Sequence, residues 1–252
     1  HPVHNQKANH TIELNVRSRE KVGSSCGIPT GSHAGTVAPG HTTRSTTWEP
    51  HTATRTVLAS ELAVILIDMW DFHPCPCALS RFRTIATAIN DTITSAREQG
   101  VLIIHAPSDV VGGYDENPAR PSYESHPARK WVTKLPNVSM PSVLIPQNKP
   151  ADPLSVAHNC DCAQPVTSRT WESETELITI HPNDALIDGN DGQSLHNIVQ
   201  ARGLKTLIYT GVATNMCIIH RRTATVAAKS WGLDVLLVRE LTDTMYNPED
   251  SP

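Results

Sequence analysis

Cys217 is the residue whose surroundings in the sequence best suit covalent chemistry. An apolar run from Thr206 to Tyr209 predicts a buried strand, Gly211 breaks it, and Cys217 opens a segment, 217–231, of helical composition. A thiol at a helix N-terminus lies near unpaired N–H groups and a partial positive charge, which favour a nucleophilic thiolate at neutral pH. The same N–H groups can bind an oxyanion. The alternative is a small buried hydrophobic residue, as most lone cysteines are.

Asp68 is the second candidate, because it directly follows the apolar run Leu62–Ile67. Such a run is typical of a strand in a parallel sheet that is covered on both faces. A carboxylate within hydrogen-bond reach of a thiol can take its proton and later return it to a leaving group. The alternative is an exposed aspartate at a strand end, and Asp71 is the less favoured substitute.

Alternating strands and helices are needed to bring these two residues together. The predicted strands are 62–67, 101–105, 177–180, 206–209 and 234–238, and the predicted helices are 80–97, 194–202 and 217–230. This alternation predicts a doubly wound, mainly parallel α/β sheet with helices on both faces, a Rossmann-like three-layer fold. Because β-α-β crossovers are right-handed, Asp68 and His105 should share the carboxyl edge of the sheet, where active sites of such folds form.

Two polar segments lie outside this alternation. Residues 1–55 are rich in Ser, Thr, Gly, Pro and His and predict an extended arm, with one short strand at 11–16, lying on the domain or on a neighbouring subunit. Residues 106–174 are irregular and Pro-rich, which predicts an inserted loop that covers the pocket. Residues 56–252 are expected to form one domain, and the long arm favours a homo-oligomer.

Two motifs in the sequence resemble those of the isochorismatase-like cysteine hydrolases, the superfamily that includes nicotinamidases and N-carbamoylsarcosine amidases. They are Leu62-Ala-Val-Ile-Leu-Ile-Asp68-Met-Trp-Asp-Phe72 and Tyr209-Thr-Gly-Val-Ala-Thr-Asn-Met-Cys217, and the resemblance covers residues 60–245. It implies that Cys217 is the nucleophile and Asp68 the general base and acid. It also implies a cis peptide between Val212 and Ala213, which would turn the amides of Ala213 and Cys217 into an oxyanion hole.

The third catalytic residue of the family is a lysine at the end of the strand before the nucleophile strand, and this sequence has His181 there. A protonated imidazole could supply the same positive charge, although histidine titrates near neutrality and lysine well above it. Lys130 and Lys134, in the inserted loop, are the alternative cations. Without any cation the protein would do different chemistry or none.

The candidates for substrate binding are large or polar rings near the expected pocket: Trp70, His105, Trp131 and Trp171. They suit an apolar or planar substrate, although packing in the core explains the tryptophans equally well. Nicotinamidase-like members bind a metal through an Asp-x-His pattern after the second strand, and the segment 105–109 lacks that pattern. We therefore expect no metal and no cofactor, and a nicotinamidase is disfavoured.

Composition and resemblance together predict a small-molecule hydrolase. A net charge of −4 gives no basic surface for nucleic acid, and no apolar run approaches the length of a membrane span. The resemblance implies hydrolysis of a non-peptide C–N bond in a small amide or carbamoyl compound through a covalent intermediate on Cys217. The alternatives are a vinyl-ether hydrolase of the isochorismate type, which uses Asp68 as acid without a nucleophilic cysteine, and a secreted binding protein that lacks the family's lysine.

Four of the six cysteines form two Cys-x-Cys pairs, Cys75/Cys77 and Cys160/Cys162. They predict disulfides in an oxidising compartment or, in a reducing one, a thiolate metal site with His73 or His158, and the sequence does not choose. Glycosylation sequons favour a secreted glycoprotein over a cytoplasmic protein; they begin at Asn9, Asn90 and Asn137. A first residue His1 in place of Met predicts a processed form.

Overall fold

The computed structural model describes residues 10–27, 43–111, 123–143 and 171–245. The chain divides into two compact units, one of Ile12–Thr56 and one of His1–Thr11 with Val57–Pro252. The predicted boundary between arm and domain stays a prediction. Among the described residues, no helix is long and apolar enough to cross a membrane.

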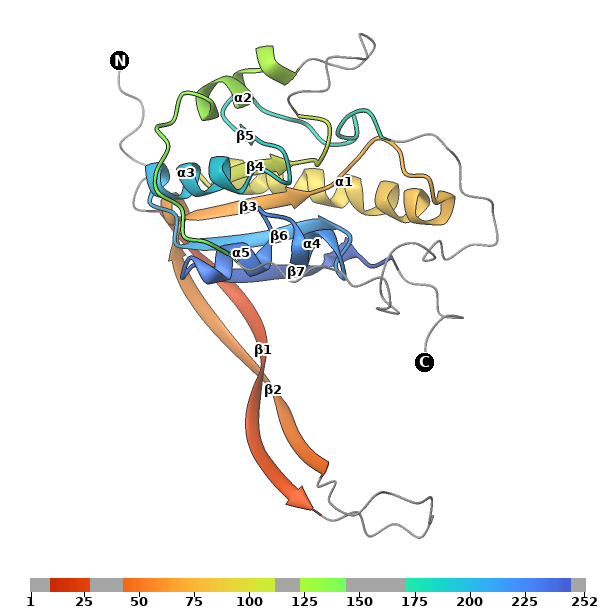
Figure 1. The fold of residues 1–252 in the computed structure, drawn as a ribbon, viewed down its shortest axis with the longest axis vertical. Coiled ribbons are helices and arrows are strands. Elements are labelled where there is room, and N and C mark those ends of the chain that lie inside the picture. Colours follow the sequence, from red (N-terminus) through yellow and green to blue (C-terminus); the bar gives the residue numbers. More distant parts are fainter. Residues whose placement is uncertain (1–9, 28–42, 112–122, 144–170, 246–252) are drawn as a thin grey trace. The chain divides into compact units, whose positions relative to one another are not determined.

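The larger unit is built on a five-stranded parallel sheet with the order β5-β4-β3-β6-β7 (Figure 1). The strands are β3 (Leu62–Ile67), β4 (Leu102–Ala106), β5 (Ala185–Leu186), β6 (Thr206–Val212) and β7 (Asp234–Asp243). All six residues of β3 are buried, as its continuous apolar run requires in a central parallel strand. The predicted doubly wound α/β fold is confirmed.

Helices follow the strands in the order that the crossovers require. They are η1 (Ala59–Glu61), α1 (Pro76–Glu98), η2 (Tyr123–Ser125), α2 (Pro127–Val132), α3 (Gly192–Arg202), α4 (Cys217–His220) and α5 (Thr225–Ser230). Asp191 caps α3 by accepting a hydrogen bond from the Ser194 amide, and Gly203, in the left-handed conformation at φ 61°, ends the helix. Local sequence signals therefore set both ends of α3.

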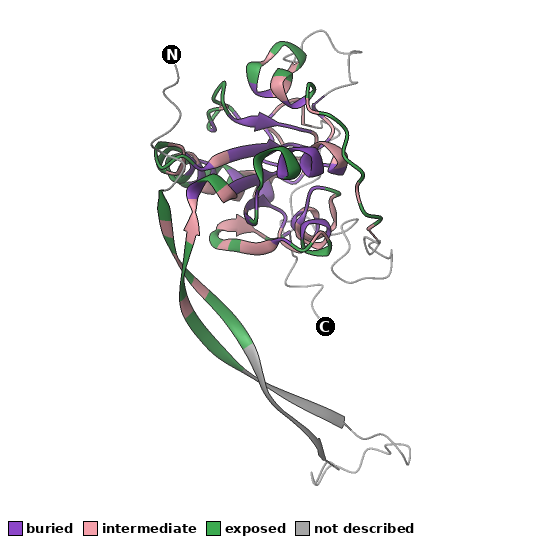
Figure 2. Cartoon of the chain, turned by 90° about the vertical axis from the view of Figure 1, so that its left-hand side faces the viewer, coloured by how far each residue is buried: buried purple, intermediate pink, exposed green. Residues whose placement is uncertain are grey.

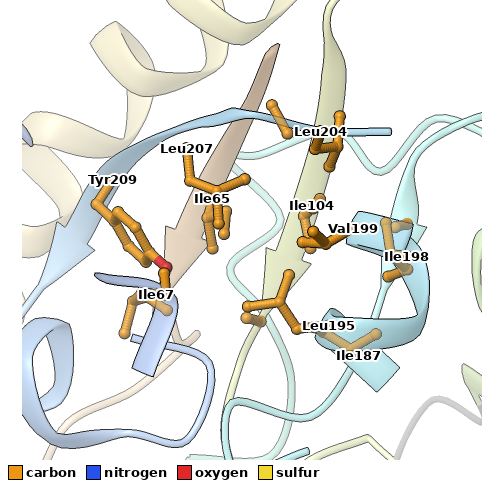
Figure 3. Close-up of a cluster of buried hydrophobic side chains, with 14 of the residues drawn as sticks. Ile65, Ile67, Ile104, Ile187, Leu195, Ile198, Val199, Leu204, Leu207 and Tyr209 are labelled. Carbon is orange, nitrogen blue, oxygen red and sulfur yellow. The ribbon is translucent and has the colours of Figure 1, made fainter. Parts of the chain in front are cut away.

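The main core lies between one face of the sheet and the helices α3, α4 and α5. Its buried side chains come from β3, β4 and β6 on one side and from α3 on the other (Figure 3), including Ile65, Ile104, Leu207, Leu195 and Val199. The apolar side chains that α1 buries belong to none of this cluster, so α1 covers the opposite face. The sheet is thus covered on both faces, and its strand ends remain as the place for a site.

The smaller unit contains a two-stranded sheet of β1 (Thr11–Gly27) and β2 (Thr43–Leu58). The predicted short strand at 11–16 is the beginning of β1, whereas β2 was not predicted because its polar sequence shows no apolar alternation. Ile12, Leu14 and Val16 are half-buried, and Figure 2 shows that the described parts of both strands expose most of their other residues.

The prediction of a strand at 177–180 is wrong, because its backbone groups are bound elsewhere. The amide of Ile178 donates to the Thr175 carbonyl in a turn, the amide of Thr179 donates to the side chain of Asn90, and the Thr179 carbonyl accepts from Arg97. The short β5 takes the place in the sheet instead. The apolar composition of 177–180 does not show that its backbone groups are bound outside the sheet.

His105 ties β4 to the segment that leads into β5. Ile104 and Ala106 point into the main core, so alternation turns His105 to the face covered by α1. Its Nδ1 lies 2.9 Å from a carboxylate oxygen of Glu174 and its Nε2 lies 3.1 Å from Asp184, and all three side chains are buried. Both ring nitrogens must donate to these carboxylates, so the imidazole is protonated. Burial alone would lower the pKa of His105, but the charge of Glu174 and the hydrogen bonds to both carboxylates raise it to about 9.

This buried imidazolium predicts a loss of stability in alkali. The folded-state pKa of about 9 exceeds the ordinary value of 6.5, so the contribution is complete below pH 6.5 and is lost as the pH rises through 9. The linked free energy of unfolding is about 3 kcal/mol. Chemical denaturation of the wild type at pH 6 to 10 should show this decline, and His105→Gln should lack it. The surface variant His181→Gln should keep it, and an equal slope in His105→Gln would contradict the assignment.

Candidate active site

Three strand ends meet at the carboxyl edge of the sheet. Asp68 follows β3, Ser108 follows β4, and Cys217 follows β6 after a short turn. Gly211, at φ 105°, allows the backbones of β3 and β6 to approach closely, since a Cβ there would lie 2.1 Å from the Ile67 carbonyl oxygen. This close approach brings the turn that carries Cys217 against Asp68.

Asp68 is fully buried, and neighbouring donors hold both of its oxygens. The Ser108 amide donates to Oδ1 at 2.7 Å, and Nε of Arg221 donates to Oδ2 at 3.1 Å. The Cys217 thiol is also hydrogen-bonded to this carboxylate. The structure therefore brings the two predicted catalytic residues, Asp68 and Cys217, into direct contact, while their catalytic roles stay a proposal.

The peptide bond between Val212 and Ala213 is cis, at the position that the family resemblance implied. The Ala213 carbonyl accepts from the Met216 and Ile218 amides at 3.0 Å and 3.2 Å, which fixes the turn before α4. The Ala213 amide itself is directed at the thiol of Cys217. A backbone donor therefore lies beside the sulfur, where an oxyanion hole would need one.

The prediction of a resting thiolate at Cys217 is wrong. Burial raises the pKa of the Cys217 thiol, and the charge of Asp68 raises it further, to about 12, although Arg221 and the Ala213 amide act in the opposite direction. The helix that should have lowered this pKa has only four residues. The resting residue is a neutral thiol, and a base must remove its proton before it can attack.

Asp68 is placed to be that base. The pKa of its carboxyl group lies above its ordinary value, because burial outweighs the guanidinium of Arg221 and the hydrogen bonds from Cys217 and Ser108, which lower it. The thiol donates to the carboxylate, so this pair holds one proton between sulfur and oxygen.

Arg221 is the charged partner of Asp68 that sequence reasoning missed. It follows α4, and the predicted continuous helix 217–230 is wrong because the chain leaves helical geometry at this residue, at φ −64° and ψ 155°. Nη1 of Arg221 donates to the side chain of Asn190 at 3.3 Å. Its position four residues after Cys217, on the same face of a helix, was the signal that could have found it.

The predicted cation His181 lies away from this contact. His181 lines a cavity of about 890 Å³ together with Ala59, Leu102 and Leu204, which lie at the amino ends of strands, so it belongs to the opposite edge of the sheet. Its backbone amide donates to Asp184. Lys130 and Lys134 are exposed, on α2 and just after it.

Two of the four predicted substrate-binding residues, Trp70 and Trp171, pack in the apolar cluster that Cys217 also contacts. Their rings stack with centroids 4.0 Å apart. Trp131 packs on the main core instead and donates to the Asp184 carbonyl at 2.6 Å. His105 is buried in the ion network described above. The pair Trp70 and Trp171 thus forms an aromatic wall in that cluster.

The paired cysteines and the sequons are only partly described. Cys75 is buried and Cys77 is half-buried at the start of α1, whereas Cys160, Cys162 and Asn9 lie outside the described residues. The disulfide or metal alternative therefore stays a prediction. Among the residues that the structure describes, no group of three or more His, Cys, Asp or Glu side chains could hold a metal ion.

Comparison with known proteins identifies relatives of this site. The isochorismatase domain profile matches residues 62–250. Ureidoacrylate amidohydrolase RutB of Rhizobium rhizogenes is 24% identical over 202 residues, which are 73% of this chain and 72% of the relative. RutB of Azorhizobium caulinodans is 22% identical over 178 residues, 64% of this chain and 68% of the relative. An isochorismatase family protein from Desulfovibrio vulgaris is a structural neighbour, with a TM-score of 0.45, 15% identity and coverage of 75% of this chain and 85% of the neighbour.

The interaction between Asp68 and Cys217 predicts that Asp68→Asn makes the thiol of Cys217 more acidic but lowers turnover. The charge of Asp68 raises the pKa of Cys217, so Asp68→Asn should lower that pKa and speed iodoacetamide labelling at pH 8, about tenfold for each pH unit by which it falls. The same variant lacks the base and should lose turnover. Peptide mapping locates the label, with Cys217→Ser as the control. Slower labelling of Asp68→Asn than of the wild type would contradict this electrostatic coupling.

Proposed function

The chain belongs to the isochorismatase family, since the family's domain matches residues 62–250, and we propose that it is a cysteine hydrolase that cleaves a non-peptide C–N bond in a small amide or carbamoyl compound. One observation carries this proposal. The half-buried thiol of Cys217 is hydrogen-bonded to the buried carboxylate of Asp68 beside the backbone donor of Ala213. Nucleophile, base and oxyanion donor therefore lie together at one edge of the sheet.

The first half of the reaction forms a covalent intermediate. Asp68 takes the proton from Cys217 as the sulfur attacks the substrate carbonyl carbon, and the carbonyl oxygen becomes an oxyanion facing the amides of Ala213 and Cys217. When the tetrahedral intermediate collapses, the C–N bond breaks. The protonated Asp68 gives its proton to the leaving nitrogen, which departs as an amine or ammonia. A thioester on Cys217 remains.

The second half releases the product with water. Asp68, again a carboxylate, takes a proton from a water molecule that attacks the thioester carbon. The C–S bond then breaks, and the sulfur regains the proton through Asp68. A carboxylic or carbamic acid leaves, and both side chains return to their starting protonation states.

The relatives and the aromatic wall support a small planar substrate. The RutB relatives are named as amidohydrolases of ureidoacrylate, a compound whose hydrolysis cleaves a C–N bond. We infer that the stacked rings of Trp70 and Trp171, in the apolar cluster against which Cys217 also packs, offer the substrate a flat apolar surface. A planar amide or ureido group can lie against such a surface while its carbonyl carbon faces the sulfur.

Replacement of the nucleophile tests this function. On a panel of small amides, N-carbamoyl compounds and vinyl ethers, the wild type should hydrolyse an amide or carbamoyl member, and Cys217→Ala should reduce kcat by a factor of about 10⁴ or more. Intact-mass measurement after rapid quenching should show an acyl adduct on the wild type that hydroxylamine removes.

The other possible outcomes of this experiment each support or exclude one of the alternative functions. Vinyl-ether cleavage that survives in Cys217→Ala but is lost in Asp68→Asn would support the isochorismate-type reaction. Cys217→Ala with wild-type turnover of an amide would exclude the thiol as nucleophile. A folded wild type that converts no member of the panel would favour the binding protein.

A further inference from the structure

We propose that Arg221 is the positioning cation of this site, which holds Asp68 ionised until it accepts the thiol proton and then balances the negative charge on the sulfur of Cys217. The inference rests on the proposed cysteine hydrolase function. It gives the role of the missing lysine to a residue that follows the nucleophile by one helical turn and that no family motif in this sequence includes.

The contacts of Asp68 make Arg221 the charged partner of the base. Asp68 is fully buried, and a buried carboxylate without a partner takes up a proton, which would remove its ability to act as a base. The Ser108 amide occupies one oxygen, and the guanidinium occupies the other at 3.1 Å. The side chain of Arg221 remains 24% exposed, so its own loss of solvation is smaller than that of Asp68.

The charge balance shows why one cation can serve both protonation states. Before proton transfer the site contains a neutral thiol, a carboxylate and a guanidinium, and after transfer it contains a thiolate, a carboxylic acid and the same guanidinium. The guanidinium interacts with the charge of Asp68 in the first state and with that of Cys217 in the second. Proton transfer therefore moves a negative charge between two neighbours of one cation and leaves the sum of the three charges unchanged.

The interruption between α4 and α5 is what turns Arg221 toward Asp68. The hydroxyl of Thr223 donates to the Gly189 carbonyl at 2.7 Å, and the hydroxyl of Tyr209 donates to the Thr223 carbonyl at 2.9 Å. The amide of Thr223 also donates to the Gly189 carbonyl, at 3.3 Å, so bonds to other segments replace the helical bonds of the Thr223 amide and carbonyl. On its other side, Arg221 is held by Asn190, which follows β5. The break is thus built by residues of three separate segments.

The remaining charged groups near this pair are acidic. Asp109 acts on the charge of Arg221, and Asp188 interacts with the charges of Asp68 and Asp109. Burial raises the pKa of Asp188 above its ordinary value. Asp109, Asp188 and the thiol of Cys217 are therefore the other groups that can affect the pH profile of activity. Asp188 repels the charge of Asp68, and Asp109 interacts with the charge of Arg221, so without the cation only the hydrogen bonds from Cys217 and Ser108 would still lower the pKa of Asp68.

Three variants separate this role from a structural one. Arg221→Gln should reduce kcat/KM at pH 7 about a hundredfold or more and move the acid limb of the pH profile to higher pH, because Asp68 loses the charge that lowers its pKa. Arg221→Lys restores a cation and should return that limb close to its wild-type position. Arg222→Gln is the matched control, since Arg222 is adjacent and exposed, and it should behave as the wild type.

Labelling of Cys217 tests the same cation without a substrate. Arg221 lowers the pKa of the thiol, so Arg221→Gln should slow iodoacetamide labelling at pH 9, about tenfold for each pH unit by which that pKa rises, opposite to the effect of Asp68→Asn. Unchanged labelling and an unchanged acid limb in a folded Arg221→Gln would overturn the proposal. If this variant does not melt cooperatively, Arg221→Lys decides alone: a folded but inactive lysine variant would also overturn it. A wild type without turnover refutes the hydrolase, whereas the labelling result still decides the role of the cation.

Discussion

The arrangement of the site depends on the groups that compensate the negative charge of one buried carboxylate. Asp68 lies at the end of the central strand β3, fully removed from water, where an uncompensated charge would be strongly unfavourable. Three different segments provide hydrogen-bond donors to this carboxylate. The loop after β4 provides the Ser108 amide, the turn after β6 provides the thiol, and the chain beyond α4 provides Arg221. Each of these contacts lowers the pKa of the carboxyl group and so opposes the effect of burial.

The parallel sheet brings these segments together at one edge. The ends of β3, β4 and β6 lie side by side because these strands are neighbours in the sheet and run in the same direction. Residues far apart in the chain, such as Asp68 and Arg221, therefore meet at one edge of the sheet. The close approach at Gly211 then sets the depth of the turn that carries Cys217, which is why a side chain cannot be accommodated there.

The sequence predicted what local pattern determines, and it failed where tertiary contacts decide. The apolar runs predicted β3, β4, β6 and β7, and two motifs predicted that Asp68 and Cys217 would meet. The helix break at Arg221 was not predictable from composition, because it depends on the bond from Thr223 to Gly189, 34 residues away. The neutral state of Cys217 was missed for a similar reason: burial and the charge of Asp68 outweigh the end of a four-residue helix.

Two buried ion networks in this fold show why a perturbed pKa alone does not identify a catalytic group. His105 is held between Glu174 and Asp184, and Asp184 in turn accepts from Arg97 at 2.8 Å, so that every charge in this network is matched by another fixed charge. The network around Asp68 differs because it ends in a thiol, a group that can give up its proton and form a bond to carbon. The first network can only stabilise the packing of β4, whereas the second can also release its proton to a reaction. What separates them is the thiol at the end of the hydrogen bonds, which acts as the nucleophile in the proposed mechanism, and this distinction follows from the contacts rather than from how far either pKa departs from its ordinary value.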